Sequence, residues 1–228
     1  MILEVIATSI KDAIVAAENG ADRIELVSGI AEGGLTPSYG LIKGVVNTID
    51  IPVNVMIRPH SLSFCYNKED LTTMIEDIKV VRKLGAKGIV LGSLKRDSTI
   101  DTTALSQLLS VAGELDVTFH RAFDEVNDQE EALTTLFGFP QVNRILTSGG
   151  RQNVLDATNQ INKLVGLTSN KSCNIIAGSG LTIDNLKEFI DKTTVKEIHF
   201  GSGVRFNGHA LEPIDSDRVR SVINMIRN

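Results

Sequence analysis

A histidine, an arginine and an aspartate stand close together in the segment Val117-Thr118-Phe119-His120-Arg121-Ala122-Phe123-Asp124. Its first residues alternate apolar and polar, as in a strand with one face toward covering helices and the other toward an interior. Imidazoles and carboxylates transfer protons, and guanidinium groups neutralise anions. A lone histidine is as often a hydrogen-bonded core residue. His120, Arg121 and Asp124 together at one strand end indicate a functional site.

The rest of the chain repeats one unit, a strand followed by a helix. Strands are expected at 2–7, 22–27, 52–57, 87–91, from 117, 143–147, 173–177 and 197–200. Helices are expected at about 10–19, 38–48, 69–84, 101–113, 128–137, 152–167, 183–192 and 216–227. Eight such units predict an α/β fold, a closed TIM-type (β/α)8 barrel, as a single domain over residues 1–228. A doubly wound sheet would need strands that are almost continuously apolar, and several of these are not.

The composition narrows the classes of partner and location. The chain has 42% hydrophobic and 22% charged residues and a net charge of −5, which is ordinary for a globular protein and disfavours nucleic acid. It has no run of roughly 18 apolar residues and no export signal pattern, so we expect no membrane span and a cytoplasmic location. Two cysteines are too few for a disulfide framework. A homo-oligomer is left open.

Strand periodicity places an unusual set of polar residues inside the barrel. With the apolar residues facing the helices, the lumen would receive Glu4, Arg23, Glu25, Asn54, Arg58, Thr118, His120, Arg144, Glu197 and His199. Barrel interiors are usually filled by branched apolar side chains. Buried charges are tolerated only when they are paired, and the near balance of arginines and glutamates indicates pairing.

Position along the strands separates these groups into two levels. Arg23 and Glu197 occur early in their strands, which favours a structural ion pair near the bottom of the barrel. Later positions lie nearer the mouth, where the catalytic groups of this fold gather. The later residues are Glu25, Arg58, His120 and His199, with Glu4 between the two levels.

Glycine-rich segments follow the last strands and indicate an anion site. Gly178-Ser179-Gly180 follows the seventh strand, Gly201-Ser202-Gly203 follows the eighth, and Ser148-Gly149 follows the sixth. Glycines let backbone N–H groups approach an anion, and barrels of this fold often hold phosphate after strands seven and eight. Such turns also serve simply as corners, so each segment alone is weak evidence.

A metal site is a further hypothesis. His120, His199, Glu4 and Glu25 would form a nitrogen and oxygen site if their strands converged, although the sequence has no His-x-x-x-His or Cys-x-x-Cys pattern. Copper(I) prefers sulfur ligands, and Cys65 is the one thiol expected near the mouth. Other residues, including His60 on the loop after the third strand, are expected to be solvated.

Several blocks resemble the CutC copper-homeostasis family along most of the chain. They are Leu3-Glu4-Val5, 20–26, 33–38, Met56-Ile57-Arg58-Pro59, 118–124 and 144–149. The resemblance implies a TIM-type barrel, a cytoplasmic protein and a role in copper handling, with copper as ligand. The positions of the residues themselves make Cys65, His120 and His199 the metal-binding candidates. The pattern departs from the family at Ile6 and Val27, where cysteines are usual.

Two classes of function therefore follow, with a regulatory ligand-binding module as a third. The first is copper homeostasis through copper binding. The alternative is an enzyme acting on a small anionic or phosphorylated substrate, and the sequence leaves open whether the protein is an enzyme. In that hypothesis His120 is the general acid and base, oriented by Asp124 or Glu25, while Arg58 and Arg121 neutralise the anion.

Overall fold

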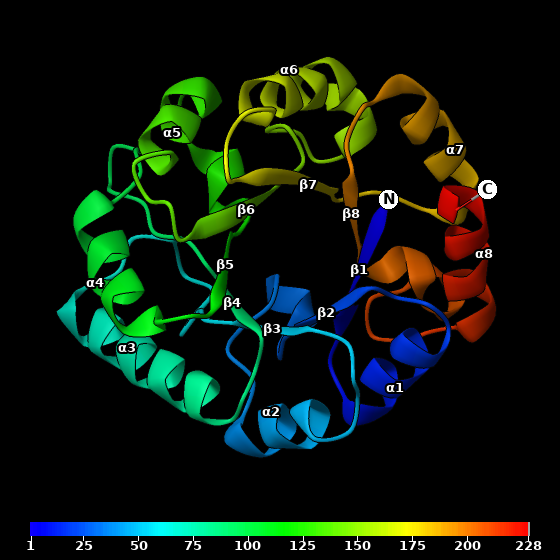
Figure 1. The fold of residues 1–228 in the computed structure, drawn as a ribbon, viewed down its shortest axis with the longest axis horizontal. Coiled ribbons are helices and arrows are strands. Elements are labelled where there is room, and N and C mark those ends of the chain that lie inside the picture. The colour runs from blue at the N-terminus through cyan, green and yellow to red at the C-terminus, as the bar shows by residue number, and fades with distance from the viewer. Residues whose placement is uncertain (228) are drawn as a thin grey trace.

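The computed structural model describes residues 1–227 and confirms the predicted barrel. Eight parallel strands close on themselves in sequence order, with β1 pairing both β2 and β8 (Figure 1). The strands are β1 (Ile2–Ala7), β2 (Arg23–Leu26), β3 (Val53–Met56), β4 (Gly88–Leu91), β5 (Asp116–Phe119), β6 (Val142–Thr147), β7 (Asn174–Gly178) and β8 (Glu197–Phe200).

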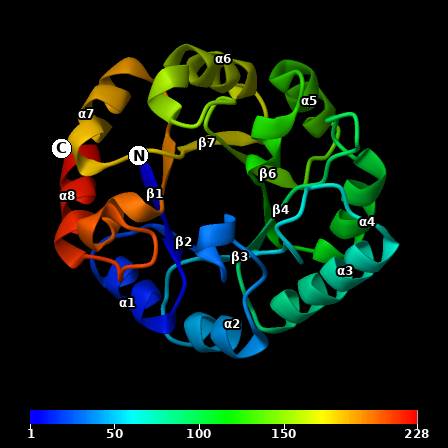
Figure 2. The same ribbon diagram turned by 180° about the vertical axis from the view of Figure 1, so that it is seen from behind.

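The helices form a ring around the strands, as the two opposite views show (Figures 1 and 2). They are α1 (Ile10–Glu18), α2 (Tyr39–Val46), α3 (Lys68–Lys83), α4 (Thr102–Ala112), α5 (Gln129–Leu136), α6 (Thr158–Thr168), α7 (Ile183–Lys192) and α8 (Ser216–Arg227). Side-chain caps start many of them: Ser9 accepts the N–H of Asp12, and Asp101 accepts those of Thr103 and Ala104. Among residues 1–227, none of the helices combines the length and apolar composition needed to cross a bilayer.

One predicted helix was wrong at its start. The expected helix 152–167 is a 3₁₀ turn, η3 (Val154–Ala157), followed by α6. Ala157 has φ −127° and ψ 20°, which is outside the helical region and separates the two pieces. Asn153 caps the turn by accepting the N–H of Leu155.

The predicted sidedness of the strands is confirmed. Apolar strand residues such as Leu3, Ile24 and Phe119 are fully buried in the core between the strands and the helices. The polar residues predicted for the lumen are also buried, and each is at most 8% exposed: Glu4, Arg23, Glu25, Asn54, Arg58, Thr118, His120, Arg144, Glu197 and His199. The barrel therefore encloses charged groups along its length.

The lower part of the barrel holds the predicted ion pairs. Arg23 donates from Nε to Glu4 at 2.5 Å and from one Nη to Glu197 at 2.7 Å. Asn174 donates to the other oxygen of Glu197 at 3.1 Å, and Arg144 donates to Asp116 at 2.8 Å. Buried charges with such partners avoid most of the cost of desolvation. We call Glu4, Arg23, Glu197, Asn174, Arg144 and Asp116 the lower network.

Candidate functional site

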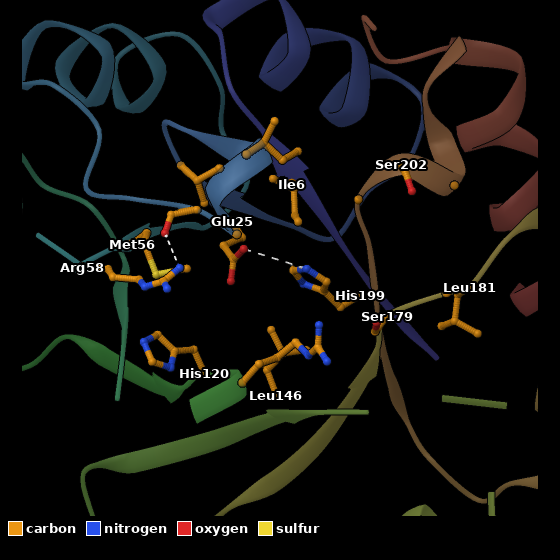
Figure 3. A pocket seen from close by; sticks show the side chains of 18 of the residues that line it. Ile6, Glu25, Met56, Arg58, His120, Leu146, Ser179, Leu181, His199 and Ser202 are labelled. Carbon is orange, nitrogen blue, oxygen red and sulfur yellow. Dashed lines mark hydrogen bonds and ion pairs between the residues drawn. The ribbon is translucent and has the colours of Figure 1, made fainter. Parts of the chain in front are cut away.

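A cavity of about 250 Å³ opens at the carboxyl ends of the strands (Figure 3). Its polar wall consists of Glu25, Arg58, His120, Arg121 and His199, together with backbone after β7 and β8. Strands that are distant in sequence meet here because the barrel closes β8 against β1. The apolar wall includes Ile6, Val27, Ile30, Met56, Phe64, Leu146 and Leu181.

His120 directly follows β5 and is held in one orientation. Its Nδ1 accepts the backbone N–H of Ala122 at 3.1 Å, in the first turn of η2 (Arg121–Glu125). A neutral imidazole that accepts at Nδ1 carries its proton on Nε2. This Nε2 is buried and has no hydrogen-bond partner within the part of the chain that the structure describes. His120 thus offers one unused N–H donor, and Ala122 orients it in place of the predicted Asp124 or Glu25.

The surroundings of His120 keep its ring neutral. The ring is 3% exposed and lies 4.7 Å from the ring of Phe64, measured between centroids. Burial, and then the positive charge of Arg58, lower the pKa of His120 to about 3. At neutral pH the side chain can donate a hydrogen bond but does not carry a positive charge.

Glu25 lies on β2 and projects into the same cavity (Figure 3). It is 2% exposed, and its Oε1 has no hydrogen-bond partner among residues 1–227. Burial raises the pKa of Glu25 to about 7, although the nearby positive charge of His199 opposes the rise. The carboxyl group is therefore divided between its acid and base forms near neutral pH, as an acid–base catalyst requires.

His199 connects Glu25 with the lower network. Its Nδ1 lies 2.8 Å from Glu4 Oε1, and its Nε2 lies 3.8 Å from Glu25 Oε2. Burial opposes the charged form of His199, but Glu25 and Glu4 outweigh it and raise its pKa. For the carboxyl group of Glu4, burial alone would raise the pKa, but Arg23 and His199 outweigh burial and hold it at about 2. Glu4 therefore supports His199 from below and is not itself on the cavity wall.

Arg58 places a buried positive charge beside His120. One of its Nη groups donates to the carbonyl oxygens of Glu32 at 2.9 Å and Gly34 at 3.2 Å, which fixes the loop after β2. The guanidinium carbon lies 4.7 Å from the centroid of Phe64, a cation–π contact. The Nε of Arg58 is buried without a partner in the described chain.

Asp124 has a different position from the one predicted. Its carboxylate accepts the hydroxyl of Thr147 at 2.5 Å, the N–H of Ser148 and the N–H of Gly150. It also pairs with Arg121 Nε at 2.8 Å. Asp124 is thus saturated by the loop after β6 and holds Arg121, which does line the cavity and whose side chain is 44% exposed.

Some of the predicted glycine-rich segments line the cavity and others do not. Ser179, Gly180, Gly201, Ser202 and Gly203 line the cavity as predicted. Ser148 and Gly149 were predicted with them, but Ser148 donates to Asp124. A side chain at Gly149 would meet Ala157 at 2.6 Å, so this glycine is needed for packing.

Two further observations concern the rim of the cavity near β7. Gly178 is packed between Leu146 and His199, so it supports the wall from behind. Ser179 has φ +80°, a rare conformation for a residue with a side chain. Strained backbone of this kind clusters at ligand-binding sites.

The predicted metal ligands come together only in part: Glu4, Glu25 and His199 of the predicted nitrogen and oxygen site meet, whereas Cys65 does not join them. Cys65 is half-buried and packs against the hydrophobic core, while the one sulfur on the wall of the cavity, within residues 1–227, is that of Met56. The His/Cys/Asp/Glu group that the described chain does bring together is Glu4, Glu25 and His199, with ligand atoms within 4.8 Å of one another. Glu4 in that group also pairs with Arg23 and His199.

Sequence reasoning missed Phe64, which lines the cavity and packs against both Arg58 and His120. The available signal was an aromatic residue in a long loop that directly follows Arg58-Pro59 at a strand end. His60, expected to be solvated, is half-buried and lies 3.3 Å from Asp70, which attaches this loop to the start of α3.

The fold and site define a class: a (β/α)8 barrel with a small, polar, buried cavity at the carboxyl ends of its strands. The CutC family model matches residues 1–204. A CutC family protein of Yersinia pseudotuberculosis is 41% identical over 201 residues, which cover 88% of this chain and 78% of the relative. One of Aliivibrio fischeri is 42% identical over 186 residues, covering 81% and 74%. The chain belongs to the CutC family.

Solved structures agree with this assignment. A CutC protein of Streptococcus agalactiae, named for copper homeostasis, superimposes with a TM-score of 0.82 at 33% identity, covering 87% of this chain and 97% of that one. A phosphoribosylanthranilate isomerase of Thermotoga maritima reaches a TM-score of 0.65 at 13% identity, covering 100% and 99%. The second likeness concerns the fold alone.

Proposed function

We propose that this protein binds a small anionic molecule in the cavity and acts on it by acid–base chemistry. The observation that carries the proposal is a set of three buried polar atoms that have no hydrogen-bond partner within residues 1–227: Glu25 Oε1, Arg58 Nε and His120 Nε2. Nearly all buried polar atoms in proteins are hydrogen-bonded, because an unpaired one costs about 1–3 kcal/mol. Three such atoms on residues of one cavity wall support a polar ligand as their partner.

Charge supports an anion as that ligand. Arg58 and Arg121 line the cavity, and the raised pKa of His199 favours its positively charged form. Glu25 is partly neutral near pH 7 and therefore only partly offsets them. The roles differ from the sequence hypothesis: Glu25 is the group that transfers a proton, and His120 is a neutral donor.

The test is binding of inorganic phosphate, measured as a rise in thermal unfolding temperature. A ligand that binds only the folded state stabilises it by RT ln(1 + [L]/Kd). We expect Arg121→Gln to weaken phosphate binding at least tenfold, because it removes a cavity charge without touching the core. Arg220→Gln on α8 is the matched control, since this exposed arginine undergoes the same change of charge. Equal binding by both variants would contradict the proposal.

Direct copper(I) binding, the other function that the sequence suggests, does not fit these donors. Copper(I) prefers thiolate and thioether ligands, and Cys65 packs against the core rather than on the cavity wall. Within residues 1–227 the cavity wall offers a single sulfur, the thioether of Met56, while Glu25 and His199 provide oxygen and nitrogen. We therefore expect copper(I) titration to give the same weak binding for the wild type and Cys65→Ser. Submicromolar binding that is lost in the variant would instead support a copper-handling role.

A further inference from the structure

Glu25 and His120 come from different sides of the barrel and reach one cavity (Figure 3). Glu25 belongs to β2, and His120 follows β5. In the described part of the chain, the Glu25 carboxyl group has an oxygen without a hydrogen-bond partner, and His120 has an N–H without one, whose direction is fixed by Ala122. One group can remove a proton while the other donates a hydrogen bond to a different atom of the same molecule.

We infer that the cavity catalyses proton transfer at a carbon next to a carbonyl group, in a small carbonyl compound that carries a phosphate or carboxylate. The inference rests on the proposed function and specifies its substrate class and reaction. Glu25 is the base, His120 is the donor to the carbonyl oxygen, and Arg58 and Arg121 attract the anionic group.

The step conserves atoms and electrons without a further reactant. The Glu25 carboxylate takes the proton from the carbon beside the carbonyl. The electron pair of that C–H bond forms a C=C bond, and the π pair of the carbonyl moves onto its oxygen. His120 Nε2–H donates a hydrogen bond to this oxygen as negative charge develops there. Glu25 then returns the proton to the same carbon, and the electron pair on the oxygen re-forms the carbonyl. When the deprotonated carbon carries a hydroxyl group, the hydroxyl proton can instead move to the enolate oxygen while Glu25 protonates the former carbonyl carbon, which gives the isomer.

The electrostatic environment agrees with these roles. A base for such a carbon must be ionised in part at neutral pH and strong enough to accept a proton, and the pKa of Glu25 is about 7. A neutral imidazole is a better match for an enolate oxygen than an imidazolium, which would give up its proton, and the pKa of His120 is about 3. Hydrogen-bond donors that are already oriented toward the developing charge, in a site that excludes water, usually make the largest single contribution to catalysis.

The dimensions of the cavity limit the substrate. At about 250 Å³ it is smaller than the roughly 300–1,000 Å³ of sites for drug-sized ligands. Ile6, Val27 and Met56 form an apolar side that has no partner for further hydroxyl groups. A short chain with one anionic end fits both features.

The experiment follows exchange of carbon-bound hydrogen in D2O by proton NMR. The probes are dihydroxyacetone phosphate and glyceraldehyde 3-phosphate, each compared with its dephosphorylated form. We expect exchange with the phosphorylated probes, a loss of at least 100-fold in Glu25→Gln, and a loss of about 100-fold to 1,000-fold in His120→Leu. His120→Gln keeps an N–H donor and should retain more activity than His120→Leu. Glu76→Gln, an exposed carboxylate on α3, is the matched control that also detects contaminating enzymes.

Thermal shifts with the same probes separate the outcomes. A probe that binds without exchange would overturn the inferred reaction and leave the proposed anion site intact. Binding of inorganic phosphate but of neither carbonyl probe would overturn the substrate class. If neither phosphate nor the probes bind, the proposed function fails, and the inference fails with it. Exchange that is equal in the wild type and Glu25→Gln would show that Glu25 is not the base.

Discussion

The lower network and the cavity contain the same kinds of residue but differ in how far these residues are paired. Below, Arg23 lies between Glu4 and Glu197, and one Nη group of Arg144 pairs with Asp116, although Arg144 Nε has no hydrogen-bond partner among residues 1–227. Above, Glu25, Arg58 and His120 each keep a buried atom without a partner in the described chain. Asn54 on β3 and Thr118 on β5 are fully buried and have side-chain atoms without a hydrogen-bond partner in the same part of the chain.

The difference separates stability from function along the barrel axis. Paired charges below hold the strands in register and fix the ring of His199 through Glu4. Unpaired groups above destabilise the empty protein but are ready for a ligand. A substitution should therefore have opposite effects on stability in the two regions.

The largest effect is expected for Arg23→Met. The change leaves Glu4 and Glu197 as buried carboxylates without their shared partner. Removal of one member of a buried ion pair typically costs about 3–5 kcal/mol, so urea unfolding should show a loss of that size. Arg220→Met on α8 should change stability by less than about 0.5 kcal/mol. Equal stability of the two variants would mean that the lower network does not stabilise the barrel.

Glu25→Gln should instead increase the free energy of unfolding above neutral pH. The pKa of Glu25 is raised from 4.5 to about 7 by folding, so the folded state keeps a proton that the unfolded state releases between these values. Stability contributed by this proton is present below pH 4.5 and is lost as the pH rises through 7. The glutamine side chain cannot titrate, so the variant does not lose this stability as the pH rises. Its free energy of unfolding relative to the wild type should therefore increase by on the order of 2–3 kcal/mol between acid and alkaline pH.

Urea unfolding at about pH 4 and at about pH 8 measures this gain. Glu76→Gln is the control, because this exposed carboxylate is 65% accessible and pairs only with Lys79 on the same helix. A parallel pH dependence for the wild type and Glu25→Gln would refute the assigned ionisation of Glu25. Glu25 would then be ionised in the folded protein at acid pH, as Glu4 of the lower network is.

The smallest change is expected for Phe64→Ala, which opens His120 to water. Burial is the main cause of the low pKa of His120, so the pKa should rise from about 3 toward its ordinary value of 6.5. In the wild type the unfolded state binds a proton at His120 below about pH 6.5 while the folded state does not, so the free energy of unfolding falls as the pH falls. In the variant this fall should be smaller. The C2 proton of His120, followed by NMR across a pH series, reports the change directly. Leu62→Ala, 88% exposed on the same loop, should leave it unaltered.

Much of the site could be predicted because strands impose a period of two. Glu25, Arg58, His120, Arg121 and His199 are all on the wall of the cavity, as their late positions in or after the strands indicated. Loop residues were less predictable. Cys65 was expected near the mouth of the barrel, but its neighbour Phe64 lines the cavity instead. The conformation of the loop after β3, and not the chemistry of its residues, decides which side chain faces the cavity.

Hydrogen-bond partners across the barrel were the hardest to predict. Asp124 was expected to orient His120, but the loop after β6 supplies enough N–H and O–H donors to engage its carboxylate fully. The roles of Glu25 and His120 as base and donor likewise depend on burial and on which atoms remain unpaired.

The sequence by itself determined the barrel and the inward direction of its charged residues, because apolar and polar side chains alternate within each strand and that alternation is local. Only the tertiary structure decided which of those charges neutralise one another and which remain available. Pairing depends on distances between atoms of strands far apart in the chain, such as Glu4 and His199, and these distances exist only after the barrel closes.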